Sequence, residues 1–275
     1  MDAGAFQLIW LSAMLHAGWN LAARRAFGDF GAVWWGLALA GTAALAGAAA
    51  LGQFPGRPSV PFFLASGVFN AVYFAALSSA YSGGELALVY PVARGTGVAL
   101  AALGAVVFLG ERFAPTGALG ILCVCLGVAA LALGAGRFGR STAAALVCGA
   151  ATAGYSVSDK LGSTRSHALP YLGAQYVVAA VLLAPWLRAR GKPLHDSLLR
   201  HPRAVAWVGF GSMAAYLLVL LAYRRAPLGY VAASREISLV FGALGGWLML
   251  REPVPPRRAA SLAMVLAGIV LIHLS

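Results

Sequence analysis

Ten long runs of apolar residues restrict the folds that are open to this chain. A helix of roughly 20 apolar residues matches the hydrocarbon core of a bilayer. Lipid offers no hydrogen-bond partner to an open backbone, and the runs lack the alternating pattern of a membrane barrel. They therefore predict an all-α integral membrane protein with ten transmembrane helices. The runs cover residues 5–23, 32–52, 60–80, 86–109, 116–135, 142–160, 168–187, 204–223, 229–250 and 257–274.

The composition agrees with a membrane protein, because 61% of the residues are hydrophobic and only 10% are charged. A soluble domain of this size needs more polar surface. The formal net charge of +12 is compatible with nucleic-acid binding, but the basic residues fall mostly in short gaps such as 188–203. Basic residues in such gaps meet anionic lipid headgroups. We therefore expect a multi-pass protein of the cell membrane, specifically a bacterial inner membrane, with lipid and no nucleic acid as partner.

The sequence contains no pattern that points to catalysis or metal binding. Cys123 and Cys125 are two residues apart, so they point to different faces of a helix, and no nearby histidine completes a metal set. Residues 134–139 fit G-x-G-x-x-G, but they follow an apolar run and not a strand. A phosphate-binding G-x4-G-K-[ST] loop is absent. We expect no enzymatic activity, no cofactor and no metal.

The chain contains an internal repeat. Sliding it by the 141 residues that separate Arg94 from Arg235 superimposes two copies of the pattern R-x7-ALG-x4-L-x-E-x3-P. The copies divide one membrane domain into residues 1–136 and 137–275, with five runs in each. Because five is odd, the second copy enters the membrane from the opposite side. The sequence therefore predicts two inverted five-helix repeats with a binding site near the midplane between them.

These motifs also resemble a known family. LHAGWN at 15–20 and the segments 87–131 and 234–272 are similar to the drug/metabolite transporter superfamily, in its EamA-type ten-helix branch. The resemblance implies two inverted five-helix halves around a central cavity. It also implies that the first, third and fourth helices of each half line that cavity.

Arg94, Arg235 and Glu236 are charged residues that lie well inside the apolar runs. A guanidinium buried in hydrocarbon is costly, so Arg94 and Arg235 are expected to face protein or a water-filled cavity. Their planar forks fit a carboxylate or phosphonate, although arginines also extend to the membrane interface or bind helix ends. Glu236 is predicted either as a proton site or as the ion-pair partner of Arg94 or of another helix's arginine. We prefer the ion pair, because the first half has Gly95 at the matching place.

Further candidates are polar or aromatic residues within the runs. His16, Trp19 and Asn20 share one helix face, at positions i, i+3 and i+4. Trp19 and Asn20 are predicted to contact substrate, and His16 is a candidate for proton coupling because histidine titrates near neutral pH. The alternative is a hydrogen-bonded cluster between helices. Tyr155 matches Trp19 in the second half. The resemblance adds Asn70, Tyr73, Tyr90 and Tyr216 as cavity residues and gives less weight to Gln175.

These features predict a secondary transporter for a small polar or zwitterionic metabolite, amino-acid-like or an organic anion. It would work by alternating access, with export as the expected direction. Proton coupling follows if Glu236 or His16 titrates, and a monomer and a dimer are both compatible with the sequence. The alternative is a non-transporting membrane component, such as a lipid-handling partner or an assembly subunit, in which ion pairs seal the arginines.

The basic residues also bear on orientation. More of them fall in the gaps on the side opposite the chain termini, which by the positive-inside rule places both termini outside the cell. The family resemblance implies termini on the inside. At the level of sequence both orientations stay open.

Overall fold

The computed structural model describes residues 1–22, 29–81, 86–133, 139–191, 194–251 and 253–275, and these form helices without any strand. The predicted all-α class is confirmed. The first half contains α1 (Ala3–Ala22), α2 (Phe30–Ala50), α3 (Val60–Tyr81), α4 (Leu86–Leu109) and α5 (Pro115–Ala132). The second half contains α6 (Arg140–Ser163), α7 (Ala168–Ala189), α8 (Leu194–Arg200), α9 (Pro202–Ala206), α10 (Ser212–Tyr223), α11 (Leu228–Ser234), α12 (Ile237–Leu250) and α13 (Pro256–His273). A 3-10 turn (Arg57–Ser59) precedes α3, and a π turn (Trp207–Gly211) joins α9 to α10.

Among the described residues, seven helical segments are long and apolar enough to cross a membrane. They are Phe30–Ala50, Arg57–Ala80, Leu88–Leu109, Pro115–Ala132, Ala168–Ala189, Pro202–Tyr223 and Pro256–His273. The runs predicted at 5–23, 142–160 and 229–250 are not in this set. The protein is therefore a multi-pass membrane protein, and the count of ten spans stays a prediction.

The run at 229–250 is one helix in the sequence prediction and two helices, α11 and α12, in the structure. The break falls at Arg235 and Glu236. Here the backbone forms tighter i to i+3 hydrogen bonds, from Ser238 N to the Arg235 carbonyl (3.1 Å) and from Leu239 N to the Glu236 carbonyl (2.9 Å). Since Arg235 lines a central cavity and Glu236 is buried against Arg94, the break directs the two adjacent charges to different surroundings.

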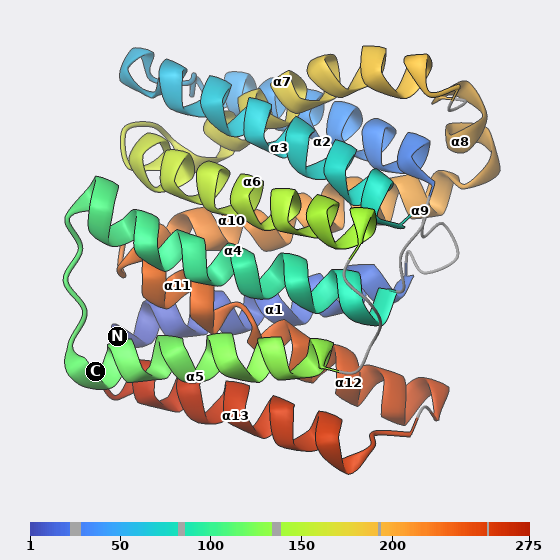
Figure 1. Cartoon of the computed structure of the whole chain (residues 1–275). Coiled ribbons are helices and arrows are strands. Elements are labelled where there is room, and N and C mark those ends of the chain that lie inside the picture. Colours follow the sequence, from blue (N-terminus) through green and yellow to red (C-terminus); the bar gives the residue numbers. More distant parts are fainter. Residues whose placement is uncertain (23–28, 82–85, 134–138, 192–193, 252) are drawn as a thin grey trace.

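The two halves interlock instead of lying side by side. The first helix of each half packs against the other half, since α1 contacts α10 and α12 whereas α6 contacts α3 and α4. The second helices, α2 and α7, pack on each other at one edge of the bundle, and α5 and α13 pack on each other at the opposite edge (Figure 1). Helices α1, α4, α6 and α10 thus form the centre of the protein.

Small residues allow close approach along these helix pairs. A Cβ atom on Gly120 of α5 would lie 2.6 Å from the carbonyl oxygen of Gly268 of α13, and the reverse distance is also 2.6 Å. A Cβ atom on Gly127 would lie 2.9 Å from the Ser261 carbonyl oxygen on the same helix pair. Backbone therefore meets backbone directly at this edge.

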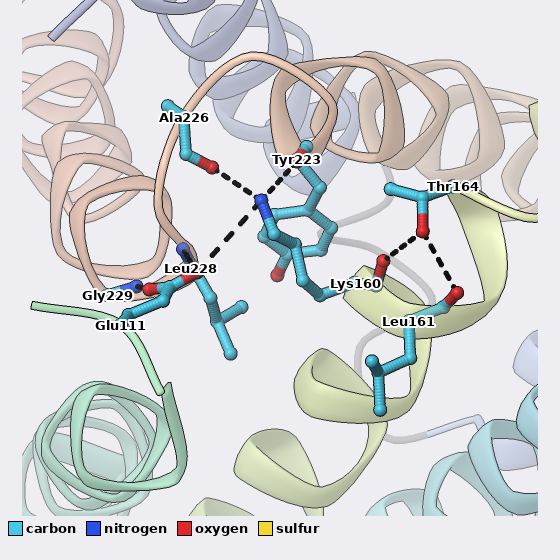
Figure 2. Close-up of polar contacts among 8 residues, drawn as sticks. All are labelled: Glu111, Lys160, Leu161, Thr164, Tyr223, Ala226, Leu228 and Gly229. Carbon is cyan, nitrogen blue, oxygen red and sulfur yellow. Dashed lines mark hydrogen bonds and ion pairs between the residues drawn. The ribbon is translucent and has the colours of Figure 1, made fainter. Parts of the chain in front are cut away.

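A polar contact joins the two halves at one end of the bundle, as Figure 2 shows. The carboxylate of Glu111, in the loop after α4, accepts a hydrogen bond from the backbone N–H of Leu228 (2.8 Å), at the start of α11. The ammonium of Lys160, from α6, donates to the carbonyl oxygen of Tyr223, the last residue of α10, and to that of Ala226 in the turn that follows (2.8 Å). Its Nζ lies 4.0 Å from the Glu111 carboxylate. Each charge therefore complements the helix end it contacts. We call this contact the Glu111–Lys160 clasp.

The clasp lies at the end of the bundle that carries both chain termini (Figure 1). The amino group of Met1 donates to the carbonyl oxygen of His273 (3.2 Å), so the two ends of the chain meet. Gly4 of α1 lies against the guanidinium of Arg225, in the turn between α10 and α11 that the clasp holds.

The clasp carries a stability prediction. Replacing Glu111 with alanine leaves the first N–H groups of α11 without their acceptor, so we expect a loss of about 1–2 kcal/mol of stability. Glu111→Gln keeps an acceptor oxygen and is expected to lose less. Thermal unfolding of the purified protein in detergent, followed by tryptophan fluorescence, measures both effects.

A charge swap tests whether the clasp acts by capping helix ends or as a simple ion pair between Glu111 and Lys160. Glu111→Lys combined with Lys160→Glu restores opposite charges but puts each one at the wrong helix end. We therefore expect the double variant to be no more stable than either single variant. Recovery to wild-type stability would show that the capping interpretation is wrong.

Candidate functional site

A cavity of about 200 Å³ lies between the two halves. Its walls come from the last part of α1 and of α3, the first part of α2, α4 and α10, and from α6, α7 and the α11–α12 break. It is therefore displaced from the Glu111–Lys160 clasp toward the opposite end of the bundle. Pockets for drug-sized ligands enclose roughly 300–1,000 Å³, so this cavity suits a smaller molecule.

The cavity brings together most of the candidate residues from the sequence. Asn20 is an exception, because its side chain lies outside the described residues. Glu236 is another, because it lines a smaller recess beside the cavity and not the cavity itself. Whether the lining residues bind substrate stays a prediction. The candidates that line the cavity are His16, Trp19, Asn70, Tyr73, Tyr90, Arg94, Tyr155, Tyr216 and Arg235.

Arg94 is held in a bidentate ion pair. Its Nε lies 3.0 Å from Oε2 of Glu236, and its Nη2 lies 2.9 Å from Oε1. The same Nη2 donates to the hydroxyl of Ser238 (3.2 Å). Glu236 is only 3% exposed, so the carboxylate is buried against the guanidinium. The ion pair anticipated for Glu236 is present, and it neutralises the arginine of the first half.

Arg235 has a different environment. Within the described part of the chain, no carboxylate lies within ion-pair distance of its guanidinium. The guanidinium carbon instead lies 5.2 Å from the centre of the Tyr216 ring, a cation–π contact. Because Arg235 lines the cavity, it presents a positive charge to whatever enters. The repeat places two arginines at equivalent positions, and of the two only Arg94 has a carboxylate partner among the described residues.

Aromatic rings form the wall beside Arg235. Tyr155 of α6 packs edge to face against Tyr216 of α10, with ring centres 6.0 Å apart. On its other side it packs against Tyr73 of α3 at 6.2 Å. His16 and Trp19 of α1 make a similar contact at 5.3 Å. Such edge-to-face contacts hold the rings in fixed orientations around the cavity.

The sequence reasoning missed Asp159. Its carboxylate is fully buried and accepts hydrogen bonds from the hydroxyls of Tyr171 (2.9 Å) and Tyr216. In the sequence it only interrupts the run at 142–160. The signal was available, because an ionisable residue within a membrane segment is a functional candidate by default. Gln175 of α7 was given less weight on the family resemblance, yet it also lines the cavity.

Comparison with known proteins places the chain in a family. Residues 140–274 match the EamA-like transporter family, and residues 32–124 match the Small Multidrug Resistance protein family. The chain therefore belongs to the drug/metabolite transporter superfamily, as its motifs predicted, and is a membrane transporter of that type. No curated protein sequence matches it.

The fold is also similar to that of a solved protein. A structure titled "Crystal structure of protein" superimposes with a TM-score of 0.80 over 100% of this chain and 98% of the other. The two sequences are 21% identical, so this similarity concerns the fold alone.

Proposed function

We propose that this protein is a secondary transporter that moves a small metabolite with a carboxylate or phosphonate group across a bacterial inner membrane. An amino-acid-like molecule or another organic anion fits this description, and export is the expected direction. The guanidinium of Arg235 carries the proposal, because it lies on the cavity wall and has no carboxylate partner among the described residues. A guanidinium fork matches a carboxylate or phosphonate in two parallel hydrogen bonds, and it cannot lose its charge at physiological pH.

The remaining cavity wall suits the rest of such a molecule. Tyr73, Tyr90 and Tyr155 offer ring faces that attract an ammonium group, as in a zwitterion. Val33 and Leu37 of α2 offer an apolar surface to a short side chain. A lipophilic cation would instead require an acidic side chain on the wall that is free to bind it. Glu236, the acidic residue beside the cavity, is already paired with Arg94.

We further propose that ten helices form an inverted repeat and support alternating access. The contacts between α5 and α13 support an inverted repeat, because each contact has a counterpart in which the two halves trade roles. Gly120 meets Gly268, and the repeat offset of 141 converts this pair into Gly127 and Ser261, which also meet. The position of the cavity, away from the Glu111–Lys160 clasp, fits a state with that end closed.

The alternative is a non-transporting membrane component, such as a lipid-handling partner or an assembly subunit. It predicts arginines sealed in ion pairs, and Arg94 meets that expectation. Arg235 does not, since within the described residues it has no carboxylate partner. Transport is therefore the better supported function.

Counterflow in proteoliposomes tests the proposal. The purified protein is reconstituted and loaded in turn with a panel of zwitterionic amino acids, dicarboxylates and aminophosphonates, and exchange of the labelled compound is followed. Each acid is paired with its amide or ester, which lacks the negative charge of the acid group. We expect exchange of at least one acid and far slower exchange of its amide or ester. Exchange of cations alone, or of nothing on the panel, would contradict the proposal.

A further inference from the structure

Asp159 is a buried carboxylate that the proposed substrate site does not use. It lies one helical turn after Tyr155 on α6, and its side chain has no exposed surface. Over the described ranges, no lysine, arginine or histidine lies within ion-pair distance of it. The adjacent Lys160 points its ammonium to the carbonyl oxygens at the end of α10 instead. Asp159 therefore differs from Glu236, which Arg94 holds with two contacts.

Neutral groups from three helices surround Asp159. The hydroxyl of Tyr171, from α7, donates to Oδ1 (2.9 Å), and the hydroxyl of Tyr216, from α10, donates to Oδ2. The other groups that interact with it are Ser66 of α3, Gln175 and Tyr176 of α7, and Tyr223 of α10. A buried carboxylate without a cation is costly, and uptake of a proton removes that cost without breaking an ion pair.

Tyr216 connects this carboxylate to the cavity. Its hydroxyl contacts Asp159 behind the cavity wall, whereas its ring lines the cavity and lies against the guanidinium of Arg235 at 5.2 Å. A hydrogen bond to a charged carboxylate is roughly twice as strong as one between neutral groups. Protonation of Asp159 therefore loosens the hold on Tyr216. Protonation also removes the negative charge of Asp159, which Tyr216 separates from Arg235.

We propose that Asp159 is a proton-binding site that couples transport to the proton gradient, and that it acts on the substrate site through Tyr216 and Arg235. This inference rests on the proposed function. Protonation leaves the charge of Arg235 less balanced, so an anion binds more tightly, and by linkage a bound anion favours the protonated carboxyl. Proton and anion then travel together, and a metabolite that accumulates inside the cell leaves with a proton.

Two assays separate proton binding from transport. Infrared difference spectra of the purified protein between high and low pH report protonation of carboxyl groups directly. We expect a carboxyl carbonyl band in the wild type that is missing in Asp159→Asn, while the matched exposed variant Asp196→Asn retains it. Identical spectra for wild type and Asp159→Asn would overturn the proposal, whatever the transport assay gives.

The transport assay uses the acid panel with and without an imposed pH gradient. We expect Asp159→Asn to lose pH-driven accumulation by about tenfold or more, whereas exchange without a gradient falls far less. Equal loss of both activities would show a structural role and overturn the coupling.

If Asp159→Asn does not fold, Tyr216→Phe replaces it. This variant should keep the infrared band and lose the pH dependence of transport. An unchanged pH dependence counts against the proposal. A wild type that exchanges nothing on the panel contradicts the proposed function, and the infrared spectra still decide whether Asp159 binds the proton.

Discussion

Replacing Arg235 with alanine is expected to abolish exchange of the acidic substrate while leaving the protein folded. The guanidinium lines the cavity and has no carboxylate partner among the described residues, so its removal leaves no buried counter-charge behind. Each hydrogen bond to a charged group contributes about 1.5–3 kcal/mol, so the loss of the fork should weaken binding on the order of 100-fold or more. Counterflow in proteoliposomes measures the loss of exchange.

The amides and esters of the acids provide the control for this prediction. The wild-type protein should prefer an acid over its amide, and Arg235→Ala should lose that preference because the group that recognises the charge is gone. Arg235→Lys keeps the charge but loses the planar fork, so partial activity is expected. An Arg235→Ala variant that still prefers the acid would exclude this residue as the anion-recognition group.

The helical class was predictable from the sequence because it follows from local chemistry. Runs of apolar residues must form helices in lipid, and this holds whatever each helix packs against. The runs at 5–23 and 142–160 are less apolar, because they carry polar residues such as His16 and Asp159 that belong to the centre of the protein. The run at 229–250 is strongly apolar, but the break at Arg235 and Glu236 divides it into two helices that are each too short to span a membrane.

The roles of the charged residues were only partly predictable. The repeat shows that Arg94 and Arg235 occupy equivalent positions, but a sequence register does not determine what lies across a helix interface. The break between α11 and α12 brings Glu236 to Arg94, and the packing of α10 brings Tyr216 to Arg235. Asp159 itself could have been singled out as an ionisable residue in a membrane segment, but its partners could not, because Tyr171 and Tyr216 contact it only through the packing of α6, α7 and α10.

The second large effect is expected at the ion pair of the first-half arginine. Glu236→Leu leaves the guanidinium of Arg94 without its counter-charge in the interior, where removal of one partner of a buried pair costs about 3–5 kcal/mol. Because the side chain of Arg94 is 20% exposed, we expect a loss near the lower end of that range. Unfolding of the detergent-solubilised protein, together with the monodisperse yield, measures it.

A double variant tests whether the pair is structural. Arg94→Met combined with Glu236→Leu replaces both charges with apolar groups of similar size, so most of the lost stability should return. The exposed pair of Asp196 and Arg200 is the matched control, because its side chains are 48% and 67% exposed and Arg200→Ala should cost less than about 1 kcal/mol. If the double variant is no more stable than Glu236→Leu alone, uncompensated charge is not the cause of the loss. If it is stable and also retains exchange of the acid, recognition of the anion does not depend on Arg94, and Arg235 alone supplies it.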